Sequence, residues 1–345
     1  MKSAVYFGPE DIRIEEKEKP RCREGEILLR IRACAICGTD VRIYYHGQKN
    51  VVPPQVIGHE IAGIIEDFDD TVSGYERGDK VISVTSVGCG QCEFCREGRH
   101  NLCLDFKALG YHYPGGFSEY MIIPAEAVKQ GNVTKVPEEL AFEEAALIEP
   151  LSCCLNGEEY LNIKEGDTVV VFGAGPIGCM HVELAKSQGA KRTILVDISR
   201  ERLSLAERFS VDTFINSREE DVVAKVLSLT HNLGAEVIIV ACSANVAQEE
   251  SLRLVKKRGR ISFFAGLPKD KPTISLDSNI IHYKEISLFG AFASSKKQYE
   301  KALSLVSSGK IEAGKFITNT IGLDELVQGM EITRSGQGLK VIVKP

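Results

Sequence analysis

The chain has 345 residues, 43% of them hydrophobic and 26% charged, and its formal net charge is −6. This length is enough for two domains of roughly 150 residues each. The acidic balance excludes a nucleic-acid-binding protein, which would carry a basic patch, and no apolar run is long enough to span a membrane.

The cysteines and the N-terminus indicate a compartment. The chain carries eleven cysteines, and its first residues, Met1 to Tyr6, lack the apolar core of a signal peptide. Cysteine clusters without an export signal are typical of metal or catalytic sites in a reducing environment. We therefore expect a cytoplasmic protein.

Residues 1–150 have the pattern of a β-rich domain. Short apolar or alternating runs are separated by glycine and proline, which is typical of a barrel or a sandwich. The predicted strands are Ile27 to Ala33, Ile61 to Phe68, Lys80 to Val84 and Phe117 to Ile123.

Three short motifs in this region carry residues that can bind a metal. They are Cys37-Gly38-Thr39-Asp40, Gly58-His59-Glu60 and Ile148-Glu149-Pro150. Thiolate, imidazole and carboxylate together suit zinc, and three protein ligands leave a position for water or substrate. Each residue also has an ordinary structural interpretation, since His59 can be a hydrogen-bonded core histidine, Cys37 a buried thiol and Glu149 a helix-end charge. The residues alone leave this joint site open.

A second cluster predicts a structural metal. Cys89, Cys92 and Cys95 are spaced three apart, and Cys103 follows after seven further residues. Four thiolates satisfy a tetrahedral zinc and leave no open position. The segment is too poor in large apolar residues to pack a core, so a bound metal would hold it together. The alternative is a disulfide pair, which a reducing compartment disfavours.

From Lys164 onward, strands and helices alternate, which predicts a doubly wound parallel sheet. The predicted strands are Thr168 to Phe172, Thr193 to Asp197, Thr213 to Asn216, Glu236 to Ala241, Arg260 to Ala265 and Glu285 to Gly290. The predicted helices are Ile177 to Gln188, Arg200 to Phe209, Asp221 to Thr230 and Val246 to Lys257. A helix from Lys296 to Ser307 and a strand from Leu339 to Val343 return to the style of the first domain.

The first strand of this sheet leads directly into a glycine fingerprint, Gly173-Ala174-Gly175-Pro176-Ile177-Gly178. In this context Gly173 permits a tight turn, Gly175 lets the backbone approach a pyrophosphate, and Gly178 lets helix and strand pack closely. The helix N-terminus, with Pro176 and Ile177 in its first turn, offers free N–H groups to the phosphates. The alternative is a glycine-rich turn without a ligand.

Asp197 ends the second strand, nineteen residues after Gly178. A carboxylate there accepts hydrogen bonds from the ribose hydroxyls of the cofactor and repels a 2′-phosphate, so we expect NAD rather than NADP. Arg200 and Arg202 are the counter-evidence, because a nearby arginine can accept that phosphate. Their positions also fit charges on a helix surface, and Arg202 is kept as a candidate cofactor contact.

Together these motifs resemble the zinc-containing medium-chain dehydrogenase/reductase family over essentially the whole chain. The shared features also include Gly115 to Tyr120 (GGFSEY). The resemblance implies a GroES-like catalytic domain, residues 1–150 and 291–345, interrupted by a Rossmann NAD-binding domain, residues 151–290. It places the active site in the cleft between the two domains and implies two zinc ions per chain.

The resemblance also implies roles for single residues. Cys37 and His59 would bind the catalytic zinc directly, while Glu60 and Glu149 would be direct, water-mediated or exchanging ligands. Thr39 resembles the hydroxyl that relays a proton from the zinc-bound alcohol. Asp40 resembles the carboxylate that orients His59, a partner that metal-binding histidines usually have.

Within the family, His59-Glu60 with Glu149-Pro150 resembles the polyol and threonine dehydrogenase branch. We expect hydride transfer between NAD and a secondary hydroxyl of a small polyol, a sugar alcohol or its phosphate. The alternatives are an L-threonine 3-dehydrogenase, a short-chain secondary alcohol or diol dehydrogenase, and a non-catalytic binding protein on this scaffold. Leu155-Asn156-Gly157 mildly disfavours threonine, because a histidine is expected there in the threonine and sorbitol enzymes.

The sequence departs from its relatives at two places. Arg42 stands where many carry a proton-relay histidine, although His46 is four residues on. Phe292 is followed by Ala293 rather than by the arginine of sorbitol dehydrogenases; Lys296 and Lys297 are nearby cations, for a substrate phosphate or for solvent. By resemblance we expect a homo-tetramer, or secondly a dimer, that pairs through an edge strand within Glu285 to Phe292 (EISLFGAF).

Overall fold

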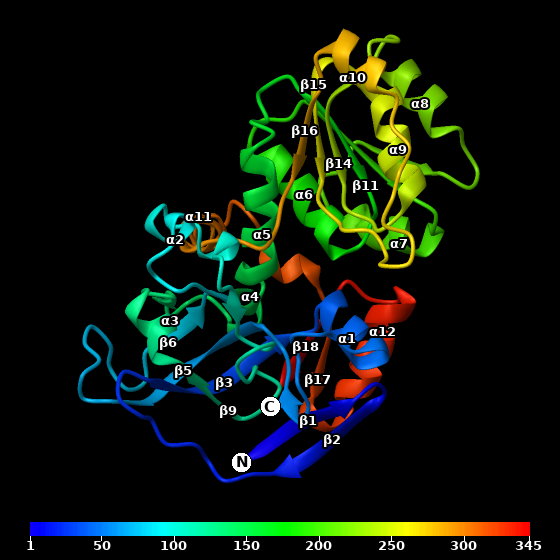
Figure 1. The fold of residues 1–345 in the computed structure, drawn as a ribbon. Helices are drawn as coiled ribbons and strands as arrows, with labels where there is room; N and C mark the ends of the chain where they lie inside the picture. Colours follow the sequence, from blue (N-terminus) through cyan, green and yellow to red (C-terminus); the bar gives the residue numbers. More distant parts are fainter. The chain divides into compact units, whose positions relative to one another are not determined.

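The structure is a computed structural model that describes residues 1–345. The chain divides into two compact units (Figure 1). Unit 1 comprises Met1–Ser152 and Ala293–Pro345, and unit 2 comprises Cys153–Phe292. No helix of the chain combines the length and the apolar character that a membrane crossing requires.

Unit 1 is built on mostly antiparallel sheets, in agreement with the β-rich GroES-like fold expected for it. Its largest sheet has the order β10 (Val133–Lys135), β6 (Lys80–Ser83), β5 (Glu60–Phe68), β3 (Ile27–Ala35), β18 (Lys340–Lys344), β17 (Ile317–Gly322), with β9 (Tyr120–Ile123) also pairing with β3. Smaller sheets join β2 (Asp11–Glu16), β1 (Lys2–Gly8) and β4 (Gln55–Val56), and β7 (Ser86–Val87) with β8 (Lys107–Ala108). Strand β3 lies in the interior of this sheet, and its side chains are buried except at Arg30 and Arg32.

Short helices surround these sheets. They are α1 (Gly38–His46), α2 (Glu93–Arg96), α3 (Ala125–Lys129), α4 (Phe142–Ala146), α11 (Lys296–Ser307) and α12 (Leu326–Ser335), with 3₁₀ turns at His100–Leu102, Ala313–Phe316 and Leu323–Glu325. Helix α5 (Ile148–Glu159) runs across the boundary between the units. Helix α11 has the bounds expected from the sequence, because Ser295 and Gln298 form a capping box at its start.

Unit 2 contains a six-stranded sheet in which every neighbouring pair of strands is parallel. The order is β13 (Thr213–Asn216), β12 (Arg192–Asp197), β11 (Thr168–Phe172), β14 (Ala235–Val240), β15 (Val255–Phe263), β16 (Ser287–Gly290). Numbered within the unit, this is the 3-2-1-4-5-6 order of the Rossmann fold. Its helices are α6 (Pro176–Ser187), α7 (Arg200–Leu205), α8 (Val222–Leu229), α9 (Asn245–Leu254) and α10 (Ser278–Lys284), with a 3₁₀ turn at Ala206–Arg208.

Unit 2 differs from the sequence prediction most clearly at three places. The helix predicted to reach Lys257 ends at Leu254, and β15 begins at Val255, where the backbone is already extended. The helix predicted for Arg200 to Phe209 breaks into α7 and the 3₁₀ turn. Strand β16 starts at Ser287 because Glu285 has a φ of 51°, a left-handed conformation that no strand accommodates. The prediction also missed α10.

Candidate metal centre and cofactor site

Cys37 lies at the N-terminus of α1, two residues after the end of β3. Its backbone is extended, and its N–H donates to Asp40 Oδ2 at 2.9 Å. Asp40 is the third residue of the helix, so this bond closes the first turn around the cysteine. The start of α1 therefore fixes the position of the Cys37 thiol.

His59 immediately precedes β5, and its ring is buried. Its Nδ1 lies 3.4 Å from Asp40 Oδ1, and its carbonyl accepts a hydrogen bond from Thr85 Oγ1 at 3.1 Å. Asp40 is fully buried, and its two carboxylate oxygens face Cys37 on one side and His59 on the other. One carboxylate thus positions both residues.

Glu60 begins β5 and is paired with a buried lysine. Both carboxylate oxygens of Glu60 lie 2.5 Å from Lys340 Nζ, which also donates to the Ile36 carbonyl at 3.3 Å. Burial lowers the pKa of Lys340, but Glu60, Cys37 and Glu149 outweigh that effect and raise it. Lys340 therefore stays a cation beside Glu60.

The structure brings three of the predicted metal ligands together. The donor atoms of Cys37, His59 and Glu60 all lie within 4.8 Å of one another. Neither His59 Nδ1 nor Asp40 Oδ1 completes a hydrogen bond, although both are buried. A thiolate, an imidazole and a carboxylate converging in this way fit zinc. We call these three residues the metal-site cluster.

The other two predicted residues lie at the margin of the metal-site cluster. Glu149 is in the first turn of α5, and its carboxylate is not among the converging donor atoms. Its charge nevertheless acts on Tyr111 and on Lys340, so it lies beside the cluster. Thr39 is half-buried in the first turn of α1.

The groups around the His59 ring shift its pKa. Burial lowers the pKa of His59, but Tyr111, Asp40 and Cys37 together raise it well above its ordinary value. A cation bound at the cluster would oppose protonation of the same ring, since metal binding and proton binding compete for it.

Lys340 is the residue of this site that sequence reasoning missed. It was expected only as part of a C-terminal strand, yet it is 280 residues away from its partner Glu60. One signal was present: a lysine that opens the apolar run Lys340–Val343. A lysine inside a buried strand needs a counter-charge, because an unpaired buried charge is too costly.

The four cysteines also come together. Their sulfur atoms all lie within 4.8 Å of one another, and all eleven cysteines of the chain are free thiols, so the cluster contains no disulfide. The backbone N–H of Cys89 donates to Cys103 Sγ at 3.1 Å, and that of Cys92 donates to Cys89 Sγ at 3.4 Å. Backbone N–H groups directed at converging sulfurs favour thiolates, the form that binds zinc.

The glycine fingerprint joins β11 to α6 as its spacing predicts. Gly173 has a φ of 104°, and Gly175 is the N-cap of α6, with Pro176 at the first helical position and Ile177 after it. A Cβ on Gly178 would lie 1.7 Å from the Gly173 carbonyl oxygen, so only glycine fits there. The nearest atom to a Cβ on Gly175 is an Arg202 nitrogen at 4.0 Å, so the backbone is open at that point.

Asp197 ends β12 beside this loop. Its Oδ2 accepts from the Ala174 N–H at 2.7 Å, and its Oδ1 accepts from the Ser199 N–H at 2.9 Å. Arg202 points toward Gly175, whereas Arg200 is exposed and paired with Glu219. Of the two arginines, Arg202 is the one near the fingerprint.

The residues that depart from the family pattern are not part of the metal-site cluster. Arg42 is exposed on α1 and donates to Gln48 Oε1 at 3.0 Å, and His46 is exposed at the end of the same helix. Lys296 lies 3.8 Å from Glu300 and near Gly131, and Lys297 is exposed.

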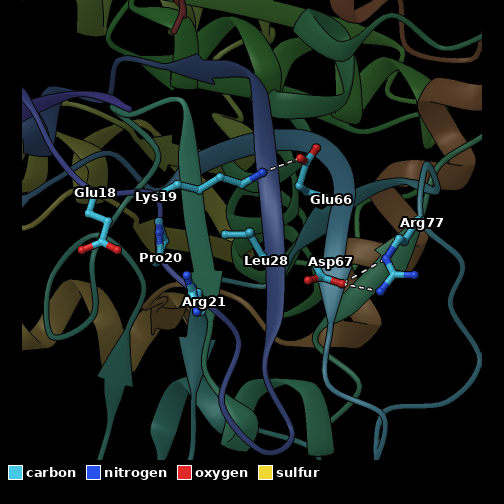
Figure 2. Close-up of a pocket in the computed structure, with 8 residues that line it drawn as sticks. All are labelled: Glu18, Lys19, Pro20, Arg21, Leu28, Glu66, Asp67 and Arg77. Atoms are coloured by element: carbon cyan, nitrogen blue, oxygen red, sulfur yellow. Dashed lines mark hydrogen bonds and ion pairs between the residues drawn. The ribbon is translucent and has the colours of Figure 1, made fainter.

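A separate pocket of about 470 Å³ opens on unit 1 (Figure 2). Its cations are mostly paired with its own carboxylates, since Lys19 contacts Glu66 at 2.5 Å and Arg77 contacts Asp67 at 2.7 Å. Leu28 lines this pocket. On β3 it lies seven residues before Ala35, which pairs with Glu60 of β5. At about 3.3 Å per strand residue, the pocket lies roughly 20 Å from the metal-site cluster and does not belong to it.

Comparison with known proteins agrees with this geometry. Residues 23–138 match the alcohol dehydrogenase GroES-like domain, and residues 176–308 match the zinc-binding dehydrogenase domain. Sorbitol dehydrogenase of Bacillus subtilis is 32% identical, covering 100% of this chain and 97% of its own. L-threonine 3-dehydrogenase of Pyrococcus horikoshii is 34% identical, covering 99% of this chain and 97% of its own.

Solved structures give the same result for the fold. A structure described as a zinc-binding dehydrogenase of Sinorhizobium meliloti, bound to NADP, superposes with a TM-score of 0.93 at 29% identity, covering 100% of this chain and 99% of that one. Sequence identity and fold agree over essentially the full length, and the two domain matches cover residues 23–138 and 176–308. The chain belongs to the zinc-binding dehydrogenase family, and it is a zinc-type alcohol dehydrogenase that works with a nicotinamide cofactor.

Proposed function

We propose that this protein oxidises a secondary hydroxyl of a small polyol, sugar alcohol or polyol phosphate, with NAD as the hydride acceptor. The observation that carries the proposal is the convergence of Cys37, His59 and Glu60 donor atoms within 4.8 Å. A scaffold that only binds a ligand has no physical need for a thiol, an imidazole and a carboxylate in one place.

In this proposal Cys37 and His59 hold the catalytic zinc, and Glu60 or Glu149 completes its coordination. When bound, zinc supplies Lewis acidity to the substrate hydroxyl and NAD supplies the hydride acceptor. Asp40 Oδ1 lies 3.4 Å from His59 Nδ1, so in this proposal Asp40 orients the ring from that side and the other ring nitrogen faces the metal. Thr39 takes the proton of the substrate hydroxyl and passes it on toward solvent.

Lys340 shapes the charge of this site. By pairing with Glu60 it offsets one of the negative charges around the metal, so that the site as a whole retains more of the cation's Lewis acidity. Cys89, Cys92, Cys95 and Cys103 hold a second zinc that fastens the chain segment around them.

The preference for NAD over NADP rests on Asp197. Its carboxylate ends β12 beside the fingerprint, where a 2′-phosphate would meet a negative charge. The similar Sinorhizobium structure is bound to NADP, so the choice requires a direct comparison of the two cofactors. Gly173, Gly175, Pro176, Ile177 and Gly178 would surround the pyrophosphate, with Arg202 supplying a positive charge nearby.

L-threonine 3-dehydrogenase activity is the second candidate. It is favoured by the 34% identity to the Pyrococcus enzyme, which is similar in extent to the match with sorbitol dehydrogenase. Leu155-Asn156-Gly157 stands where a histidine is expected in both enzymes, and the Asn156 side chain donates to the Phe292 carbonyl at 3.4 Å.

The test is NADH formation by zinc-loaded protein. The panel holds sorbitol, xylitol, galactitol, arabinitol, inositols, polyol phosphates, 2,3-butanediol, 2-butanol and L-threonine, with NADP in parallel. We expect a polyol, a polyol phosphate or a diol to be the best substrate, with NAD preferred. A clear preference for L-threonine would establish the second candidate, and silence across the panel would refute both.

We also propose a homo-tetramer in the cytoplasm. Strand β16 is an edge strand, Leu288 on it is 37% exposed, and Tyr283 just before it is 75% exposed. An apolar edge strand is normally paired or covered, and eleven free thiols suit a reducing compartment. Light scattering should give four times the mass of the chain; a monomer would contradict the assembly, and a dimer would reduce it to pairing through β16.

A further inference from the structure

Tyr111 is an aromatic residue beside the metal-site cluster that the mechanism above does not use. Its ring packs on the imidazole of His59, with the ring centroids 5.1 Å apart and the planes inclined by 40°. The residue lies in the loop between β8 and β9 and is half-buried, so part of its side chain stays accessible.

The loop that carries Tyr111 is pressed against the residues before β5. Gln55 Nε2 donates to the Tyr111 carbonyl at 3.1 Å, and the Tyr111 N–H donates to the Ala108 carbonyl at 3.3 Å. Gly110 has a φ of 77°, and a Cβ there would lie 2.7 Å from the Gly58 carbonyl oxygen. The fold therefore fixes where the Tyr111 ring lies.

All hydrogen bonds of Tyr111 within the protein involve its backbone atoms, so its hydroxyl has no partner there. It nevertheless lies among the groups of the metal site. Its electrostatic neighbours are His59, Cys37, Asp40 and Glu149. At neutral pH it is an unused O–H donor, and tyrosine hydroxyls in such places usually have a partner.

We propose that Tyr111 determines specificity by donating a hydrogen bond to a substrate hydroxyl next to the one that is oxidised. The inference rests on the proposed function and narrows its substrate class to vicinal diols and polyols. A ring packed on a metal ligand keeps its hydroxyl near the oxygen that reacts. A second substrate hydroxyl, on the neighbouring carbon, is the group that can accept a hydrogen bond from the Tyr111 hydroxyl.

The test compares two substrates with the same carbon skeleton, 2,3-butanediol and 2-butanol, in the wild type and in Tyr111→Phe. The variant keeps the ring on His59 and removes only the hydroxyl. We expect its kcat/KM for the diol to fall on the order of tenfold, the size of one lost hydrogen bond. The kcat/KM for 2-butanol and the zinc content should not change.

Tyr113→Phe is the matched control from the same loop. The hydroxyl of Tyr113 lies near Glu126 and Asp105 rather than near the metal-site cluster, since burial and then these two carboxylates raise its pKa. This variant should leave the ratio of diol to 2-butanol activity unchanged.

Two outcomes would overturn the inference, and they can be told apart. If the wild type is active and Tyr111→Phe leaves the substrate ratio unchanged, or lowers both activities equally, Tyr111 does not determine specificity and the proposed function stands. If the wild type forms no NADH from any substrate of the wider panel, the proposed function fails and the inference fails with it.

Discussion

At the scale of single residues, the ion pair between Glu60 and Lys340 sets the charge balance of the metal site. The two side chains are 0% and 2% exposed, so water does not solvate either charge. Removing two charges from water costs roughly several kcal/mol per ion, which only close pairing offsets. The 2.5 Å contacts to both carboxylate oxygens provide that pairing.

Replacing one partner should therefore be much worse than replacing both. In zinc-free protein, Lys340→Met leaves the Glu60 carboxylate buried and unpaired, and we expect it to lower the free energy of unfolding by about 3–5 kcal/mol. The double variant Lys340→Met with Glu60→Gln leaves no charge and should regain most of that loss. Urea denaturation measures both. Equal stability of the single variant and the wild type would show that the pair contributes nothing.

At the scale of elements, the turn between β11 and α6 separates a structural glycine from a functional one. A Cβ on Gly178 would collide with the Gly173 carbonyl oxygen at 1.7 Å, whereas a Cβ on Gly175 has no atom nearer than 4.0 Å. The two positions have the same residue type for different physical reasons.

Two alanine variants test this distinction. Gly178→Ala should lower the free energy of unfolding by about 3 kcal/mol, because the helix must move away from the strand. Gly175→Ala, the matched control for stability, should fold normally but raise the KM for NAD on the order of tenfold, since the methyl group occupies the approach of the pyrophosphate. Denaturation together with cofactor titration distinguishes them, and an unchanged KM in Gly175→Ala would refute this site for the pyrophosphate.

The pKa values of the four clustered cysteines predict the order in which their thiols react. Backbone N–H groups of Leu104 and Cys95 lower the pKa of Cys92 to about 6, whereas burial raises the pKa of Cys95 to about 12. In protein stripped of zinc, Cys92 is therefore a thiolate above pH 6 and Cys95 stays protonated. Of these four cysteines, iodoacetamide at pH 7 should label Cys92 first and Cys95 last, as measured by mass spectrometry. In zinc-loaded protein all four should be protected; equal labelling rates without zinc would contradict the assignment.

At the scale of the whole molecule, local sequence patterns predicted the individual strands and helices better than they predicted which distant strands pair. The alternation of strands and helices predicted a parallel sheet, and β11, β13 and α11 have the predicted bounds. The sequence does not encode locally that β18 lies between β3 and β17, because β3 is far from both along the chain. The pairing of Lys340 with Glu60 depends on that arrangement and was missed for the same reason.

The candidate site shows the same division. Residues within one motif, such as Cys37 and Asp40, were predictable because a helix start constrains both. The packing of Tyr111 on His59 was not, because it depends on how a loop folds back onto β5. Loop residues escape pattern-based reasoning since no periodicity fixes where their side chains lie.

The proposal that Cys37 and His59 hold the metal at which a hydroxyl is oxidised has one decisive test. Zinc content and NADH formation are measured on the same preparations of the wild type and Cys37→Ser, with the best substrate of the panel. We expect two zinc ions per chain in the wild type. In the variant we expect one zinc ion, held by the four cysteines, and a loss of at least about 100-fold in kcat/KM. A Cys37→Ser variant that keeps both zinc ions and full activity would contradict it.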